Sequence, residues 1–299
     1  MGLCDGRIAI VTGAGRGLGR AHALMLAKHG AKVVVNDLGS AATGIGADAS
    51  PADEVVAEIQ AMGGEAVADY GNVATWAGAE TLVRTAVDHF GGLDVVVNNA
   101  GILRDRMLVN MTEDEWDSVV TVHMKSTFAM THHAANHWRM MSKKGETPDA
   151  RVINTTSHSG LYCNVGQTNY AAAKAGIASF SIVAARELQR YGVTVNALAP
   201  RATTRMTEGL WEWTEEQLEN RKPEYVASLV AWLASTKSAG ISARVFEVWG
   251  YGITVAESWQ HGQTAEASLD PNDLDGPVRA AIAGSRKNAG IDLGVELDP

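Results

Sequence analysis

Cysteine is scarce in this sequence: only Cys4 and Cys163 occur among 299 residues, far apart in the chain. Neither has metal-ligand spacing to other residues, so the sequence suggests neither a disulfide framework nor a zinc site. Such a chain is typical of a reducing compartment, and we expect it in the cytoplasm.

Basic residues and long apolar runs are also lacking. The 25 Lys and Arg against 34 Asp and Glu give a net charge of -9, which is unsuited to tracking the phosphates of nucleic acid or an anionic membrane. No apolar stretch reaches the roughly 20 residues of a membrane span, and the first residues lack the length and cleavage site of a secretory signal. We therefore predict a globular protein that binds a small molecule, with no nucleic acid and no membrane as partner.

Short apolar runs do recur, with longer helical segments between them. They are β-branched and lack alternating polar residues, which is typical of strands buried on both faces of a parallel sheet. This predicts an α/β fold with a doubly wound parallel sheet of the Rossmann type. The predicted strands contain residues 8–11, 33–35, 66–68, 95–97, 152–153, 193–198 and 245–248.

Two regions depart from this rhythm. Residues 203–223 contain Trp211 and Trp213 among many glutamates and are placed like a lid. After residue 255 the composition shifts toward Asp, Gly, Ala and Pro. We predict a single domain over residues 1–255 with a C-terminal tail over 256–299, which either wraps on a partner subunit or frays.

A glycine-rich loop, TGAGRGLG, directly follows the first predicted strand and leads into a helix. Glycine permits a tight turn and close approach of the backbone to a pyrophosphate, and the free N–H groups of a helix N-terminus attract anions. A plain strand-to-helix turn is the alternative. The candidate cofactor contacts of this loop are Gly13, Arg16, Gly17, Leu18 and Gly19.

Asp37 follows the second apolar run, where a carboxylate meets the adenosine ribose hydroxyls of a dinucleotide. A carboxylate at this position repels a 2'-phosphate and therefore selects NAD over NADP. Arg16 argues the other way, because a basic side chain in the loop could reach that phosphate. Asp37 could also merely start a turn with Gly39. Since Asp37 is nearer the ribose, we predict NAD as the cofactor.

Tyr170 and Lys174 stand four residues apart in NYAAAKAG and so share one face of a helix. An ammonium beside a phenol stabilises the phenolate and moves the pKa of the tyrosine toward neutrality. Ser157, just after the RVINTT strand, can hold a substrate oxygen. Each feature alone is common on a helix surface or in a polar run. Together with the glycine-rich loop they predict a dehydrogenase site.

TGAGRGLG, NNAG, Ser157 and YAAAK, in this order and spacing, resemble the short-chain dehydrogenase/reductase family over residues 5–250. The resemblance implies NAD(P)-linked oxidoreduction, with Tyr170 as acid/base, Lys174 on the nicotinamide ribose and Ser157 on the substrate oxygen. It also implies a homodimer or homotetramer. Further cofactor contacts are expected at Asn72, Val73, Asn99, Ala100, Gly101, Ala202 and Thr203.

His123 stands where most members of that family have an asparagine. The asparagine holds a water in the proton relay from the lysine, so His123 either does the same or titrates itself. A histidine that only packs is the alternative.

Longer segments, including VVVNNAGILRDR and KPEYVASLVAWLAS, resemble the hydroxyacyl-CoA dehydrogenase domains of peroxisomal multifunctional enzymes and bacterial steroid-catabolic relatives. This implies NAD-dependent oxidation of a 3-hydroxyacyl-CoA in fatty-acid or steroid side-chain β-oxidation. Arg201 and Arg205 border the lid, where they either meet a CoA phosphate or pair with glutamates. The alternatives are a dehydrogenase of free hydroxysteroids or other secondary alcohols, and a catalytically silent partner subunit.

Overall fold

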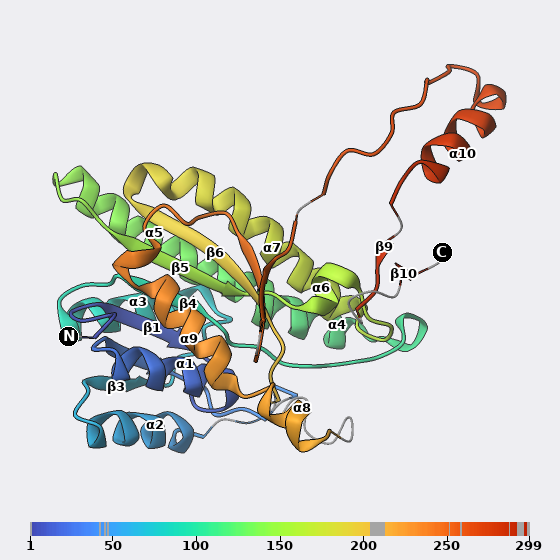
Figure 1. Ribbon diagram of the computed structural model, residues 1–299. Helices are drawn as coiled ribbons and strands as arrows, with labels where there is room; N and C mark the ends of the chain where they lie inside the picture. Colours follow the sequence, from blue (N-terminus) through green and yellow to red (C-terminus); the bar gives the residue numbers. More distant parts are fainter. Residues whose placement is uncertain are drawn as a thin grey trace.

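An eight-stranded sheet forms the centre of the computed structural model, in the order β3-β2-β1-β4-β5-β6-β7-β8 (Figure 1). Strands β1 to β7 are parallel, and β8 pairs antiparallel with β7. The structure describes residues 2–41, 43–44, 46, 48–203, 213–250, 252–257, 259–286, 288–291 and 296–297. The strands are β1 (Ile8–Thr12), β2 (Lys32–Asn36), β3 (Ala66–Asp69), β4 (Val95–Asn98), β5 (Ala150–Thr155), β6 (Val193–Pro200), β7 (Val245–Trp249) and β8 (Gly252–Val255).

The seven predicted strands and the doubly wound parallel sheet are confirmed. The strand β8 was not predicted. Three of its four residues are exposed at the sheet edge, so it lacks the buried apolar run that marks the other strands. Its antiparallel pairing needs only a tight turn after β7, whereas a further parallel strand would need a long crossover.

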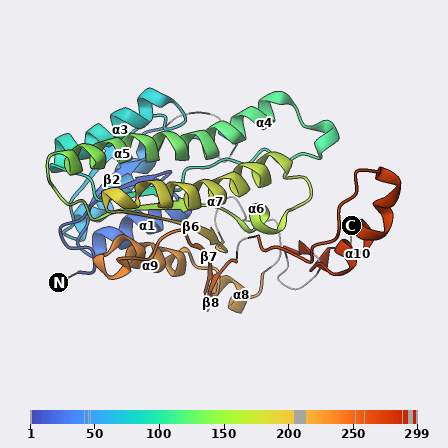
Figure 2. The same ribbon diagram turned by 90° about the horizontal axis from the view of Figure 1, so that it is seen from above.

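Helices cover both faces of the sheet (Figure 2). On one face lie α1 (Gly17–Lys28), α2 (Ser50–Ala61) and α9 (Pro223–Ala234). The other face is covered by α3 (Trp76–Phe90), α5 (Ser126–Lys143) and α7 (Thr168–Leu188). The remaining helical elements are η1 (Leu108–Asn110), α4 (Glu113–Val120), the π-helical turn η2 (Thr121–Lys125), α6 (His158–Tyr162), η3 (Gln189–Tyr191), α8 (Glu215–Glu219), η4 (Thr236–Ser238), η5 (Pro271–Asp273) and α10 (Asp275–Ala283).

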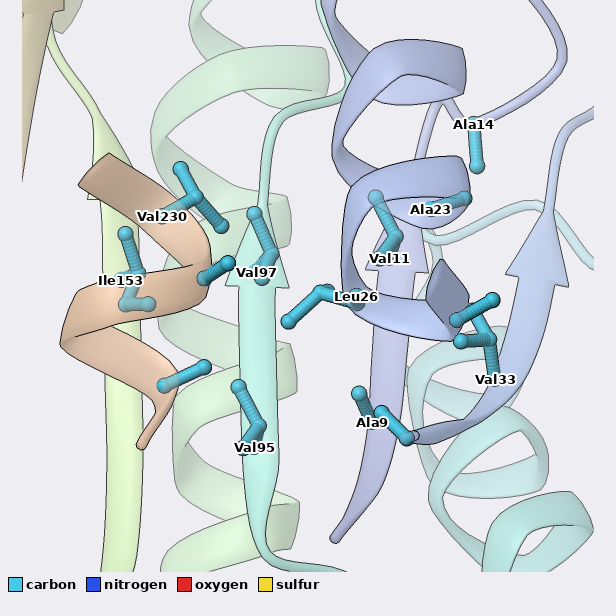
Figure 3. Close-up of a cluster of buried hydrophobic side chains, with 14 of the residues drawn as sticks. Ala9, Val11, Ala14, Ala23, Leu26, Val33, Val95, Val97, Ile153 and Val230 are labelled. Atoms are coloured by element: carbon cyan, nitrogen blue, oxygen red, sulfur yellow. The ribbon is translucent and has the colours of Figure 1, made fainter. Parts of the chain in front are cut away.

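The core on the α1 side is built from branched side chains of the central strands (Figure 3). Leu26 of α1 and Val230 of α9 pack against Val11, Val97 and Ile153, and all five side chains are buried. Each fully buried side chain of this size contributes about 1.5–3 kcal/mol. This packing makes the sheet a rigid base for the loops at the carboxyl ends of its strands.

The chain after residue 255 leaves the sheet, and α10 lies apart from it in both ribbon views. Trp259 is 97% exposed. The Arg201 guanidinium Nη2 donates to the Ile291 carbonyl at 2.7 Å, which ties the tail back to the end of β6. Strands β9 (Asn288–Ala289) and β10 (Glu296–Leu297) pair antiparallel with each other. The division at residue 255 and the role of the tail remain predictions.

Part of the predicted lid, residues 204–212 with Arg205 and Trp211, lies outside the described residues. Both cysteines are free, as expected, with Cys4 buried and Cys163 exposed. Within the described ranges, no three His, Cys, Asp or Glu side chains are grouped to hold a metal ion. The described helices include none that is long and apolar enough to cross a membrane. The expected cytoplasmic location stays a prediction.

Candidate active site

The loops that follow β1 and β4 meet at one edge of the sheet, because these strands are neighbours. The Thr12 hydroxyl accepts the N–H groups of Asn99 and Ala100, both at 3.0 Å. The Asn99 amide donates to the Thr12 carbonyl at 3.0 Å and to the Gly13 carbonyl at 3.2 Å. Gly13 has φ +62°, and a Cβ there would lie 2.8 Å from the Ala100 Cα. Three predicted cofactor residues are thus brought together.

The N-terminus of α1 is open for an anion. Arg16 is its N-cap residue in extended conformation, but no side chain caps this end and the first turn carries no acidic residue. A Cβ on Gly19 would lie 2.0 Å from the Gly13 carbonyl oxygen, so only glycine lets the loop fold this tightly. The uncapped N–H groups around Gly17 and Leu18 suit the pyrophosphate of a dinucleotide.

Asp37 directly follows β2, next to this loop. Its carboxylate accepts the Gly15 N–H at 2.7 Å and the Gly39 N–H at 2.6 Å. The turn with Gly39 is therefore present, and the bond to Gly15 also places the carboxylate beside the glycine-rich loop. Hydrogen bonds from Ser50 lower the pKa of the nearby Asp48, and the charge of Arg16 lowers it further, so Arg16 lies near a carboxylate.

The other predicted cofactor residues extend along the same edge. Asn72 and the buried Val73 follow β3, and the Asn72 side chain accepts the Ala74 N–H at 3.0 Å. Ala202 and Thr203 follow β6. The Thr203 hydroxyl oxygen is buried and has no hydrogen-bond partner among the described residues. Such an orphaned hydroxyl fits a polar group of a bound nicotinamide cofactor.

Tyr170, Lys174 and Ser157 come together at the carboxyl end of β5. The Lys174 Nζ lies 5.6 Å from the centre of the Tyr170 ring, on the same face of α7. Its ammonium donates to the Thr155 carbonyl at 2.6 Å. The Ser157 hydroxyl lies near enough to the Tyr170 phenol to lower its pKa. The arrangement places a hydroxyl, a phenol and an amine around one point, as acid/base chemistry on an alcohol requires.

Burial dominates the electrostatics of this group, and the lowering of the Tyr170 pKa by Lys174 stays a prediction. Burial raises the pKa of Tyr170, and the nearby Ser157 hydroxyl only partly opposes this. Burial also lowers the pKa of Lys174 to about 7. The physical reason is that both groups are desolvated, so a lysine that is partly neutral near pH 7 supplies less positive charge to the phenol.

His123 lies in the π-helical turn η2, edge-on to the Tyr170 ring with ring centres 5.1 Å apart. Its Nε2 is 3.1 Å from the Ile102 nitrogen and 2.8 Å from the Ile102 carbonyl oxygen. Burial, with the charge of Lys174 in second place, holds the pKa of His123 well below its usual value. The neutral ring therefore packs on Tyr170. Its buried Nδ1 has no partner among the described residues, so the water-holding role stays a prediction.

Gly101 leaves the space that this histidine occupies. A Cβ on Gly101 would lie 2.2 Å from the His123 Cε1. Any side chain at Gly101 would collide with the imidazole ring of His123. This requires glycine at position 101 more strictly than a turn would.

Asn169 is a site residue that the sequence analysis missed. Its buried amide donates to the carbonyls of Arg104 at 3.0 Å and Glu115 at 2.9 Å, and its Oδ1 accepts the Tyr170 N–H at 2.7 Å. It therefore fixes the start of α7 against the segment after β4. Its position next to Tyr170 was the available signal, but its partners are distant in the sequence.

The loop between β2 and α2 was also missed. Its ends meet through the Asp48 N–H, which donates to the Leu38 carbonyl at 3.1 Å. At its far side, the Arg104 Nε donates to the Thr43 carbonyl at 2.6 Å. Because β1 lies between β2 and β4 in the sheet, this contact carries the loop across the carboxyl end of β1. We refer to the described residues of this loop, 38–41, 43–44, 46 and 48, as the crossing loop.

Cys163, which follows α6, has φ +63° and ψ 149°, a backbone region used almost only by glycine. Strain of this kind costs about 1–3 kcal/mol, whereas the extra flexibility of glycine costs about 0.5–1 kcal/mol. We therefore expect Cys163→Gly to stabilise the protein by about 1 kcal/mol in urea unfolding. Cys163→Ala keeps the strain and serves as the control. Equal unfolding midpoints for the two variants would refute the prediction.

Comparison with known proteins agrees with this geometry. Residues 7–217 match the sequence profile described as short chain dehydrogenase. The chain is 44% identical over 290 residues to the hydroxyacyl-CoA dehydrogenase ChsB1 of Mycobacterium tuberculosis, covering 94% of this chain and 90% of that protein. It is 47% identical over 244 residues to the peroxisomal multifunctional enzyme type 2 of Mus musculus, covering 82% of this chain but 32% of that protein. A crystal structure of a short chain dehydrogenase from Mycobacterium avium superposes with a TM-score of 0.88 at 49% identity, covering 98% of this chain and 100% of that chain.

Proposed function

Because the chain belongs to the short-chain dehydrogenase family and is an NAD(P)-dependent oxidoreductase, we propose that it oxidises the 3-hydroxyl of a 3-hydroxyacyl-CoA with NAD. The observation that carries the proposal is the meeting of Ser157, Tyr170 and Lys174 beside the glycine-rich loop. The identity of 44% to a hydroxyacyl-CoA dehydrogenase over 94% of the chain supports the substrate class. The product is the 3-ketoacyl-CoA, in fatty-acid or steroid side-chain β-oxidation.

The site residues divide the tasks of the reaction among them in this proposal. A bound nicotinamide ring supplies the hydride acceptor. Ser157 holds the substrate oxygen, and Tyr170 in its phenolate form takes the hydroxyl proton. Lys174 holds the cofactor ribose and, when protonated, favours the phenolate. The neutral His123 keeps the Tyr170 ring in place and offers its Nδ1 to a water of the proton relay.

Assays of one panel of substrates with NAD and with NADP test the proposal. The panel contains 3-hydroxyacyl-CoA thioesters of several lengths, the corresponding free acids, and free secondary alcohols including hydroxysteroids. Reduced cofactor should form fastest with a thioester. Turnover that is fastest with a free hydroxysteroid would favour the alcohol dehydrogenase alternative. No turnover in the whole panel would leave the silent subunit as the remaining alternative.

Cofactor preference is expected to depend on the charge of Asp37. Its carboxylate beside Gly15 accepts ribose hydroxyls and repels an added phosphate. We expect kcat/KM to favour NAD over NADP by at least about tenfold, or about 1.4 kcal/mol. Asp37→Asn keeps an acceptor for the loop but removes the charge, so it should narrow the preference. Asp53→Asn, on α2, is the control that should leave it intact. Equal use of both cofactors by the unmodified protein would contradict the assignment.

A homodimer or homotetramer is part of the proposal. Several apolar side chains are exposed on α5, α7 and the turn before α5, where the family resemblance places the subunit interface. They include Met124 at 40%, Phe128 at 45% and Val183 at 51% exposure. Burial of such side chains against a second copy would supply the hydrophobic driving force for association.

A further inference from the structure

The buried carboxylate of Glu247 contacts both ends of the short helix that follows Ser157. Glu247 lies on β7, and its side chain is only 4% exposed. Its Oε1 accepts the Tyr162 hydroxyl at 2.6 Å, and its Oε2 lies 3.0 Å from the His158 Nε2. Because His158 and Tyr162 are the first and last residues of α6, one side chain of the sheet contacts both ends of this turn.

The turn held in this way carries Ser157. Ser157 is the N-cap residue of α6, and its Oγ accepts the Ser159 N–H at 3.2 Å. The same hydroxyl lies near the Tyr170 phenol and lowers its pKa. A displacement of α6 against the sheet would therefore move the Ser157 oxygen relative to the phenol. Misplacements of about 1 Å in such sites cost about a hundredfold in rate.

The charge of Glu247 is compensated where it lies. Burial alone would raise the pKa of this carboxyl, but the contacts with His158 and Tyr162 and the nearby charge of Arg201 hold it below its usual value. A buried carboxylate is costly unless it is paired and hydrogen-bonded. These partners keep Glu247 ionised between β7 and α6, where its two oxygens can hold both ends of the turn.

We propose that Glu247 is a positioning residue of the dehydrogenase reaction, which acts with His158 and Tyr162 to fix α6 and thereby the Ser157 hydroxyl. This inference rests on the proposed role of Ser157 in holding the substrate oxygen. Glu247, His158 and Tyr162 act indirectly in this proposal. They set the position of the Ser157 hydroxyl, which is the group that contacts the substrate.

A double-mutant cycle tests the coupling, with any substrate that the unmodified protein turns over. Glu247→Ala should lower kcat about 10- to 100-fold and leave the Kd of the cofactor unchanged. Glu247→Gln keeps the shape and an acceptor for Tyr162, so it should restore most of the rate. In a Ser157→Ala background, Glu247→Ala should cost less than about threefold more, because the hydroxyl that it positions is gone.

Controls separate this role from loss of stability. Asp149 pairs with Arg7 and Arg151 just before β5, at the opposite edge of the sheet from Ser157. Asp149→Asn should therefore lower the unfolding midpoint and leave kcat unchanged. If Glu247→Ala does not fold, Tyr162→Phe removes only one hydrogen bond and should show a smaller loss with the same non-additivity.

Two results would overturn the inference, and they are distinguishable. Equal losses from Glu247→Ala with and without Ser157→Ala would show that the carboxylate does not act through Ser157, while the proposed function stands. Near-normal turnover of Ser157→Ala alone would remove the proposed role of Ser157 and the inference with it.

Discussion

Tyr170→Phe should lower turnover by about two to four orders of magnitude and leave cofactor binding intact. The variant keeps the ring that packs on His123 and removes only the hydroxyl that exchanges a proton with the substrate. Steady-state assays give the rate, and fluorescence titration of the reduced cofactor gives its Kd. Tyr191→Phe, at the amino end of β6, is the control and should be fully active. Near-normal turnover of Tyr170→Phe would contradict the assigned chemistry.

The acid/base role of Tyr170 also predicts how the reaction rates of the unmodified protein depend on pH. Oxidation needs the phenolate, and burial raises the pKa of this phenol. The rate of alcohol oxidation should therefore rise as the pH increases above neutrality. Ketone reduction needs the protonated phenol, which persists until the pH approaches this raised pKa, so its rate should stay level near neutrality and fall only at higher pH. Residual activity of Tyr170→Phe should lack the rise of the oxidation rate with pH.

A 3-hydroxyacyl-CoA should exceed the corresponding free acid or a free hydroxysteroid by at least about a hundredfold in kcat/KM, or about 2.7 kcal/mol. The CoA group offers phosphate and pantetheine contacts far from the reacting carbon. Such remote binding energy is used to orient the carbinol for reaction. Truncation of the substrate should therefore lower kcat as well as raise KM.

Two arginines near the end of β6 suit the phosphates of such a substrate. The Thr203 N–H donates to the Arg221 carbonyl at 2.8 Å, which brings Arg221 to the end of β6, and burial together with the charge of Arg201 lowers the pKa of Arg221. An anion beside these arginines would oppose this lowering of the pKa. Arg221→Gln should therefore shrink the thioester advantage, whereas Arg186→Gln on α7 should not. Equal efficiency with a free hydroxysteroid and a thioester would refute the acyl-CoA assignment.

Local sequence signals predicted those parts of the protein that depend on neighbours in the chain. The apolar runs identified β1 to β7, and the spacing of Tyr170 and Lys174 predicted their shared face on α7. Glu247 and Asn169 were missed because their partners come from distant elements and are chosen by the packing of the sheet. A sequence also does not report how completely a side chain is desolvated, and burial raises the pKa of Tyr170.

The crossing loop suggests an order in which cofactor and substrate bind and are released. Arg104 donates to the tip of this loop at Thr43, while its carbonyl accepts the Asn169 amide at the start of the catalytic helix. We expect a dinucleotide bound along the sheet edge to lie beneath the Arg104–Thr43 contact and therefore to bind and leave when this contact is broken. We expect ordered kinetics, in which the cofactor binds first and leaves last. We expect release of the reduced cofactor to be the rate-limiting step of turnover.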